Sequence, residues 1–371
     1  PMAFGFLPSF SRSYGNKMFV VTVDGISANG KITVFNPQDD TVLATISLTE
    51  PGTNIAIAEN KLYVAENATI EVFDISTYAQ ITTIAVGQSP AQLHISGQNI
   101  FVANYGEDTV SIIDTVSDTV TGTLTVGSNP ATFTQVGSNL YVNNFTTDTI
   151  SVIDTVSETV VDTISSVDSP YYSVAVGSKL YVANNSNLNQ VTVIDTVTNT
   201  VTGTIAVGAI PYFILAVGTK VYSTGVDANT ISVIDSSSDT VIETIQTSGD
   251  PNYMAVAGNY LYVTGTGAGA LDVVDTTTDT IVSTVQTDSL GTGYTTVVGD
   301  KVYISIDNRI LVLDNKILPN TIPALLSFTS SAVSGTYRFG QTINVTATFD
   351  RNIKAGSTMT VALNSGGSAT L

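Results

Sequence analysis

A segment of about forty residues recurs eight times along the 371-residue chain, and this repeat constrains the fold more than any other feature of the sequence. In each copy an aromatic residue follows an apolar one, and successive aromatic residues lie 38 to 44 positions apart. A second marker, two apolar residues followed by Asp (Asn in the first copy), recurs in phase with the first. The aromatic positions are Phe19, Tyr63, Phe101, Tyr141, Tyr181, Tyr222, Tyr262 and Tyr303.

Two further markers recur in the repeat: the run Thr-Val-x-x-Thr-Ile, as at 200–205, and the run Val-Gly-x-x-Pro, as at 126–130. All four markers are short, rich in β-branched residues and separated by Gly, Pro, Asn, Asp and Ser, which is typical of strands joined by turns. Four strands in a period of about forty residues indicate one blade of a β-propeller, and the absence of a 3.6-residue periodicity argues against helical repeats. The sequence therefore predicts an all-β fold in which residues 1–318 form an eight-bladed propeller.

The repeat also resembles a known family. Residues 181–184 (Tyr-Val-Ala-Asn) and 63–66 (Tyr-Val-Ala-Glu) are similar to the tetrapeptide of YVTN repeats, and the four markers recur in register with it over residues 1–318. The resemblance implies a propeller of an archaeal or bacterial surface protein, usually with seven blades. A seven-bladed propeller is therefore the alternative to the eight blades counted here.

The two ends of the propeller predict how the ring closes. The eighth repeat lacks the fourth strand after Asp314, whereas residues 4–8 (Phe-Gly-Phe-Leu-Pro) match the end of a fourth strand. We expect residues 1–5 to pair with the strand at 309–314, because closure removes an unpaired sheet edge.

Residues 319–371 follow a different pattern. The segment 342–349 alternates apolar and polar residues, which predicts a half-buried strand. The stretches 337–349 and 363–367 are similar to Ig-like or cadherin-like modules of large surface proteins, so we expect part of a β-sandwich. A complete sandwich of this kind needs about 100 residues. Two explanations stay open: the chain continues past Leu371, or a neighbouring chain supplies strands.

Composition argues against several functions. The net charge of −19, with only 12 Lys and Arg, argues against nucleic acid as a partner. No apolar run reaches the roughly 18 residues of a transmembrane segment. There is no Cys or Trp, and the one histidine, His94, cannot build a His-rich metal site. Propeller enzymes similar to this scaffold use His, Trp or metal clusters, so we expect no catalytic site and no cofactor. The acidic loop at 106–108 leaves calcium open, although EF-hand spacing is absent.

The Asp of the second marker recurs once per blade, as at Asp114, in a turn rich in Thr and Ser. A carboxylate in this position can accept hydrogen bonds from backbone amides two residues on, so we expect it to stabilise the turn. Equivalent positions are spread around a ring and cannot converge on one substrate.

Two groups of side chains are candidates for ligand binding. Aromatic residues two positions after the Pro of the fourth marker, or after the residue equivalent to it, are expected near the mouth of the central channel. There they either stack on a sugar or peptide or pack between adjacent blades. They are Phe10, Tyr172, Phe213, Tyr253 and Tyr294. The loops between second and third strands vary in length, and variable loops on a rigid scaffold commonly bind ligands. They contribute Tyr105, Phe145 and Asn184.

Four Asn-x-Ser/Thr sequons provide candidate glycosylation sites: Asn67, Asn144, Asn184 and Asn344. The resemblance and composition together predict a non-enzymatic, extracellular structural or adhesion protein that binds cell-surface glycans or proteins, or copies of itself in a layer, sheath or filament. The alternative is a monomeric carbohydrate- or peptide-binding receptor, and a propeller enzyme comes third.

Overall fold

The computed structural model of the chain describes residues 11–23, 30–266, 269–286, 292–306 and 309–314, together with 325–330, 345–349, 360–362 and 368–370. By their contacts the residues divide into two compact units, Pro1–Leu313 and Asp314–Leu371. Each unit is described by itself.

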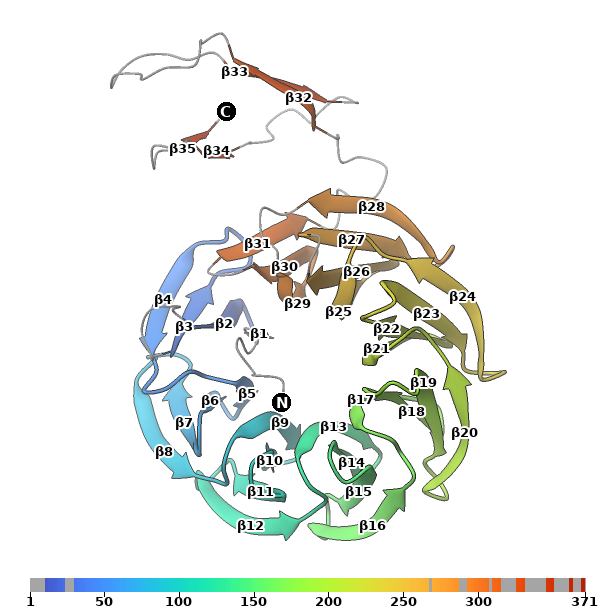
Figure 1. Cartoon of the computed structure of the whole chain (residues 1–371). Helices are drawn as coiled ribbons and strands as arrows, with labels where there is room; N and C mark the ends of the chain where they lie inside the picture. The colour runs from blue at the N-terminus through green and yellow to red at the C-terminus, as the bar shows by residue number, and fades with distance from the viewer. Residues whose placement is uncertain are drawn as a thin grey trace. The chain divides into compact units, whose positions relative to one another are not determined.

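The first unit is an all-β propeller of eight blades arranged around a central channel (Figure 1). The predicted eight blades are confirmed, and the seven-bladed alternative is set aside. Blades 1 to 4 contain β1 (Ser11–Tyr14), β2 (Lys17–Val23), β3 (Gly30–Phe35), β4 (Val42–Ser47); β5 (Asn54–Ala58), β6 (Lys61–Ala65), β7 (Thr69–Asp74), β8 (Gln80–Ala85); β9 (Pro90–Ser96), β10 (Asn99–Asn104), β11 (Thr109–Asp114), β12 (Thr119–Thr125); β13 (Pro130–Val136), β14 (Asn139–Asn144), β15 (Thr149–Asp154) and β16 (Thr159–Ser165). Blades 5 to 8 contain β17 (Pro170–Val176), β18 (Lys179–Asn184), β19 (Gln190–Asp195), β20 (Thr200–Ala206); β21 (Pro211–Val217), β22 (Lys220–Gly225), β23 (Thr230–Asp235), β24 (Thr240–Gln246); β25 (Asp250–Ala257), β26 (Tyr260–Thr266), β27 (Ala270–Asp275), β28 (Thr280–Gln286); β29 (Thr292–Val298), β30 (Lys301–Ile306) and β31 (Arg309–Asp314).

The burial of the strands explains the repeat markers. Each blade is an antiparallel sheet in chain order, with its first strand beside the channel (Figure 1). Blades 1 to 7 have their fourth strand at the periphery, and three strands of blade 8 are described. The second and third strands are covered by neighbouring blades on both faces, so β10 and β11 read as continuous apolar runs. The peripheral β12 is mostly exposed and polar. Hydrophobic clusters therefore join adjacent blades, as where Tyr63 of blade 2 packs with Ile100 of blade 3.

In blades 2 to 7, the Asp that ends the third strand stabilises the following turn, as predicted. Asp114 Oδ1 accepts hydrogen bonds from the backbone N–H of Val116 (3.0 Å) and of Ser117 (2.7 Å). These bonds favour the charged carboxylate and lower the pKa of Asp114. The same arrangement occurs in other blades at Asp74, Asp154, Asp195, Asp235 and Asp275.

A second acidic residue of this turn joins neighbouring blades. Asp118 has a left-handed backbone (φ 54°) and accepts hydrogen bonds from Lys61 Nζ (2.6 Å) and the Tyr63 hydroxyl (2.7 Å) of the preceding blade. We call this Lys–Tyr–Asp arrangement the inter-blade clamp. Its other members are Lys179 and Tyr181 with Asp239, Lys220 and Tyr222 with Asp279, and Lys301 and Tyr303 with Asp40.

The clamp of Lys301, Tyr303 and Asp40 closes the ring, because it joins blade 8 to blade 1. Lys301 Nζ lies 2.6 Å from Asp40 Oδ2, and the Tyr303 hydroxyl lies 2.9 Å from Asp40 Oδ1. Beside the channel, β1 contacts β29, and every other inner strand contacts its neighbours in the ring. The predicted pairing of residues 1–5 lies outside the described residues.

In the second unit, β32 (Leu325–Ser330) pairs with β33 (Val345–Phe349), and β34 (Thr360–Ala362) pairs with β35 (Ser368–Thr370), both antiparallel. The expected strand at 342–349 is described over its last five residues, and the Ig-like assignment stays a prediction. The described part of the chain contains no helix long and apolar enough to cross a membrane.

Candidate ligand site in the central channel

Seven aromatic side chains form one connected group at the channel. Tyr171, Tyr172, Tyr212 and Phe213 occupy the two positions after the first proline of β17 and β21. Tyr253 and Tyr294 come from β25 and β29, and Phe145 from the loop after β14. We call these seven residues the channel aromatic cluster.

The rings of the cluster are in direct contact. Tyr253 and Tyr294 stack with centroids 4.1 Å apart, and Tyr171 and Tyr212 stack at 5.0 Å. Tyr172 meets Phe213 at 4.9 Å, and its neighbour Tyr171 meets Phe145 edge-on at 5.6 Å. Such offset and edge-to-face geometries are favourable for aromatic pairs.

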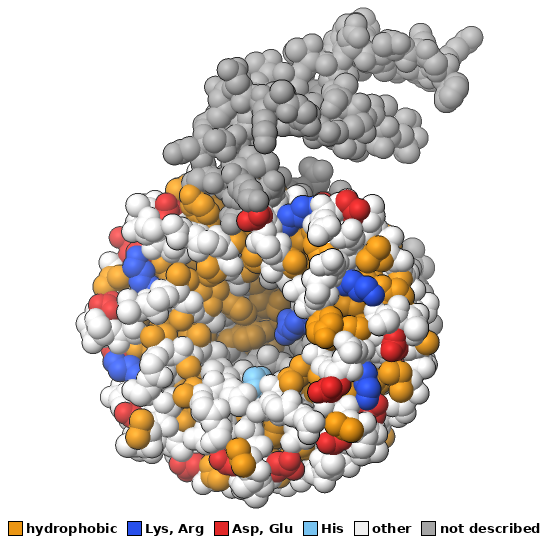
Figure 2. Space-filling model, turned by 180° about the vertical axis from the view of Figure 1, so that it is seen from behind, with side chains coloured by type: hydrophobic (Ala, Val, Ile, Leu, Met, Phe, Trp, Pro, Cys, Tyr) orange, Lys and Arg blue, Asp and Glu red, His pale blue; other side chains and the backbone are white. Residues whose placement is uncertain are grey.

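The cluster also connects blades that are not adjacent. The hydroxyl of Tyr172, in blade 5, lies 2.7 Å from the hydroxyl of Tyr294, in blade 8. A second pair of hydroxyls, of Tyr212 and Tyr253, lies 2.9 Å apart. Packing between neighbouring blades alone therefore does not account for these tyrosines. Figure 2 shows the central hollow of the propeller with hydrophobic side chains gathered inside it.

Burial keeps the phenols neutral. It raises the pKa of Tyr212 to about 12, with the nearby Tyr172 adding to the effect. Burial also raises the pKa of Tyr171, Tyr172, Tyr253 and Tyr294. Most of these side chains are nevertheless half-buried rather than fully enclosed. The cluster thus presents uncharged rings with hydrogen-bonding edges.

Among the described residues, the cluster occupies one side of the ring. At the equivalent two positions blade 3 has Ala91 and Gln92, and blade 4 has Ala131 and Thr132. Those blades pack into the same ring and connect their inner strands through polar contacts, such as Gln92 Oε1 accepting the Phe133 N–H at 2.6 Å. Formation of the ring therefore does not require aromatic residues at these positions.

The other residues predicted to bind a ligand lie in different environments. Tyr105 is half-buried and close enough to Tyr171 to influence its pKa. Asn184 is buried, and its Nδ2 donates to Thr192 Oγ1 at 2.9 Å, so its side chain serves the blade interior. Phe10 lies outside the described residues.

The sequons differ in accessibility. Asn67 is exposed. Asn144 and Asn184 are buried with their amide nitrogens hydrogen-bonded inside the blade, which leaves no room for a glycan in the folded chain. Asn344 lies outside the described residues.

His94 lies on β9, half-buried, with Nε2 2.7 Å from Gln135 Oε1 of the adjacent blade. Burial lowers the pKa of His94, and the Gln135 hydrogen bond opposes this. Within the described ranges, no three His, Cys, Asp or Glu side chains are grouped so that they could hold a metal ion.

Comparison with known proteins assigns the family. The profile of the YNCE-like beta-propeller family matches residues 76–362, more than half of the chain. The chain belongs to the YNCE-like beta-propeller family. No curated protein sequence matches this YNCE-like propeller.

Solved structures share the propeller fold at low sequence identity. The computationally designed Ika8 protein has a TM-score of 0.70 at 12% identity, over 84% of this chain and 98% of its own. The dihydro-heme d1 dehydrogenase NirN has a TM-score of 0.67 at 13% identity, over 81% and 74%. BamB from Moraxella catarrhalis has a TM-score of 0.65 at 13% identity, over 82% and 95%. At these identities the likeness shows the fold alone.

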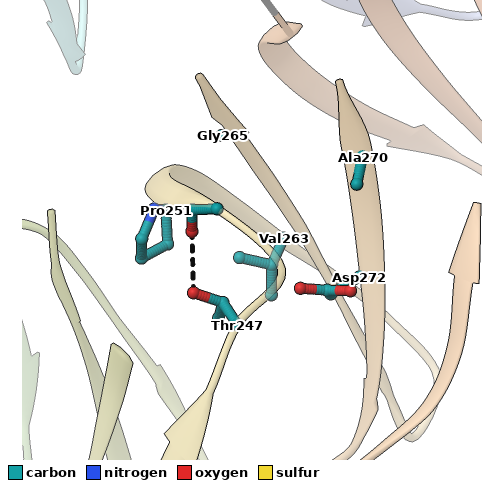
Figure 3. Close-up of a pocket in the computed structure, with 7 residues that line it drawn as sticks. Thr247, Pro251, Val263, Gly265, Ala270 and Asp272 are labelled. Carbon is teal, nitrogen blue, oxygen red and sulfur yellow. Dashed lines mark hydrogen bonds between the residues drawn. The ribbon is translucent and has the colours of Figure 1, made fainter. Parts of the chain in front are cut away.

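A small cavity in blade 7 of the YNCE-like propeller is a weaker candidate site (Figure 3). Its volume of about 10 Å³ leaves room for no more than one water molecule. The carboxylate of Asp272, on its wall, accepts hydrogen bonds from the Ser248 N–H (2.7 Å) and from Thr284 Oγ1 (2.6 Å). The Thr247 hydroxyl donates to the Gly249 carbonyl at 2.8 Å. These polar groups already have partners, so the cavity is part of the blade's packing.

Three residues of the channel site were missed by sequence reasoning: Arg12, Tyr171 and Tyr212. The tyrosines directly follow Pro170 and Pro211, and comparison with Ala91 and Ala131 at the same repeat position could have found them. Nothing in the repeat distinguishes Arg12, because its strand β1 meets β29, the strand of Tyr294, only when the ring closes.

Proposed function

We propose that this YNCE-like propeller is a non-catalytic binding protein of the cell surface, in which the channel aromatic cluster contacts a cell-surface glycan. The one-sided aromatic cluster on a closed ring carries the proposal. Half-buried aromatic rings with a few polar groups are typical of small-molecule sites. The surrounding loops offer neutral hydroxyl and amide groups, as at Thr146, Asn185 and Ser186, which suit a ligand with many hydroxyls.

The non-catalytic part of the proposal rests on the roles of the polar side chains. The repeated aspartates are used by turns and inter-blade clamps, as at Asp114 and Asp118. His94 is paired with Gln135. The extracellular location rests on the resemblance to YVTN repeats and on the Ig-like pattern of residues 319–371.

Replacement of two cluster tyrosines tests the binding site. The variant Tyr171→Ala/Tyr212→Ala introduces the residue that blades 3 and 4 carry at the same position, so we expect it to fold. Glycans bound by the wild-type protein on an array should bind the variant at least tenfold more weakly, since full burial of one large apolar side chain contributes about 1.5–3 kcal/mol. Isothermal titration calorimetry measures the change. The control Tyr14→Phe, outside the cluster, should bind normally, and equal affinity of all three proteins would contradict the proposal.

Self-assembly is a second candidate, favoured by apolar residues that recur on one turn of three consecutive blades. Val116, Val156 and Val197 are 64%, 82% and 80% exposed. The equivalent positions in blades 6 and 7 are Ser237 and Thr277. A repeated exposed valine is therefore not needed for the turn, and it fits contact with another copy of the chain.

The triple variant Val116→Thr/Val156→Thr/Val197→Thr tests assembly, because it preserves shape and removes the apolar surface. We expect the wild-type protein to associate with increasing concentration and the variant to remain monomeric. Analytical ultracentrifugation measures both. A wild-type protein that is monomeric at every concentration would exclude this candidate.

A further inference from the structure

Arg12 is placed at the channel aromatic cluster although it comes from another part of the ring. It lies on β1, the innermost strand of blade 1, and its side chain is exposed to water. The hydroxyl of the adjacent Ser11 is hydrogen-bonded to Thr296 on β29, the strand that carries Tyr294. The electrostatic influence of Tyr294 and Tyr172 on the pKa of Arg12 agrees with this placement. These are the tyrosines whose hydroxyls meet between blades 8 and 5.

Among the described residues, the positive charge of the Arg12 guanidinium is not neutralised by an ion pair with a carboxylate. In the described part of the chain all ion pairs are made by lysines of the inter-blade clamps, and no carboxylate is paired with Arg12. Its Nη1 donates to the carbonyl of the adjacent Ser11 at 3.0 Å. A guanidinium has five N–H donors, and this bond uses one of them.

This position is unusual in a protein of net charge −19 with 12 Lys and Arg. An exposed guanidinium beside aromatic rings attracts an anion more strongly than one surrounded by water alone, because the rings lower the local dielectric constant. The flat guanidinium matches a carboxylate with two parallel hydrogen bonds. The rings of Tyr171 and Tyr212, stacked on each other, belong to the same connected cluster as Tyr172.

We propose that the channel site selects an acidic sugar, a uronate, whose carboxylate pairs with Arg12 while its ring packs against the channel aromatic cluster. The inference rests on the proposed function and narrows its ligand class. A uronate supplies both the anion that Arg12 lacks and a ring with hydroxyls for the tyrosine edges and polar loops. A neutral sugar supplies the ring with hydroxyls but no anion.

Trigalacturonate and its methyl ester test the inference, since they share the same sugar chain and the ester replaces each carboxylate by an uncharged methyl ester. By isothermal titration calorimetry the wild-type protein should bind the acid at least tenfold more tightly than the ester. Raising the salt from 0.05 to 0.5 M should weaken binding of the acid and leave the ester unchanged. The variant Arg12→Gln should bind both equally, at the ester's affinity.

Arg12→Lys is the matched variant, because it keeps the positive charge and removes the guanidinium that can form a bidentate hydrogen bond with a carboxylate. It should retain a preference for the acid that is several-fold smaller than that of the wild-type protein. Circular dichroism and thermal unfolding of both variants should match wild type, because the Arg12 side chain is exposed.

Each result distinguishes this inference from the proposed function. Equal binding of acid and ester by wild type, with both lost in Tyr171→Ala/Tyr212→Ala, overturns the selection of uronate and leaves the glycan site standing. A preference for the acid that survives Arg12→Gln also overturns it. Binding of a dipeptide with a free carboxylate, in place of either glycan, overturns the sugar class itself.

Discussion

Two glutamates of blade 2 stand where other blades carry neutral side chains. Glu66 and Glu71 are 0% and 2% exposed, and the corresponding pair in blade 3 is Asn104 and Ser111, hydrogen-bonded at 2.8 Å. The Thr49 hydroxyl lies 2.8 Å from Glu66 Oε2 and 3.1 Å from Glu71 Oε1. The two carboxyls also interact directly, and burial together with Glu71 raises the pKa of Glu66 to about 7. Glu66 is therefore protonated when the folded protein is below neutral pH.

This pair predicts a pH dependence of stability. The folded chain keeps the Glu66 proton at pH values where the unfolded chain has lost it, so the free energy of unfolding should fall as pH rises from about 4.5 to 7. Glu66→Asn/Glu71→Ser, which copies blade 3, should remove this fall and unfold with about 2 kcal/mol more free energy at pH 8. Urea unfolding at pH 5 and pH 8 measures it, both above the range in which the capped aspartates titrate. The exposed Glu243→Gln is the control, and a wild-type protein equally stable at both pH values would contradict the prediction.

At the scale of the strands, the sequence predicted the contacts that a side chain makes within its own blade. The apolar runs predicted the doubly covered second and third strands, and Asp114 stabilises its turn as expected because both partners lie within three residues. The inter-blade clamp was not predicted, since Tyr63 and Asp118 lie 55 residues apart and meet only when two blades pack. The same holds for Arg12, whose strand β1 contacts β29 of blade 8 only in the closed ring.

The aromatic residues of the inner strands were also predicted only in part. Tyr172, Phe213, Tyr253 and Tyr294 were selected as a repeat position, and their place beside the channel follows from the fold. The repeat position does not show the direction of each side chain. It therefore could not decide whether these residues pack between neighbouring blades or meet across the channel.

For the whole molecule, no local sequence pattern specifies how the ring closes between blades 8 and 1. Adjacent blades elsewhere are joined by a short chain segment as well as by packing. Blades 8 and 1 meet through residues 263 positions apart, Tyr303 and Asp40. Contacts between distant segments carry a larger chain-entropy cost than contacts between neighbours. This interface should therefore be the first to open.

Asp40→Ala tests this expectation against the matched clamp variant Asp239→Ala. Each change removes an acceptor from a buried tyrosine, and each should lower the free energy of unfolding by about 1–3 kcal/mol. Asp40→Ala should in addition speed amide hydrogen exchange throughout β2, β3 and β30, because the two blades it separates have no short connecting segment to hold them together. Asp239→Ala should change exchange only near its own turn, since the chain between β20 and β21 keeps blades 5 and 6 adjacent. Hydrogen exchange followed by mass spectrometry resolves these strands, and equally local effects in both variants would show that the interface between blades 8 and 1 is no weaker than the others.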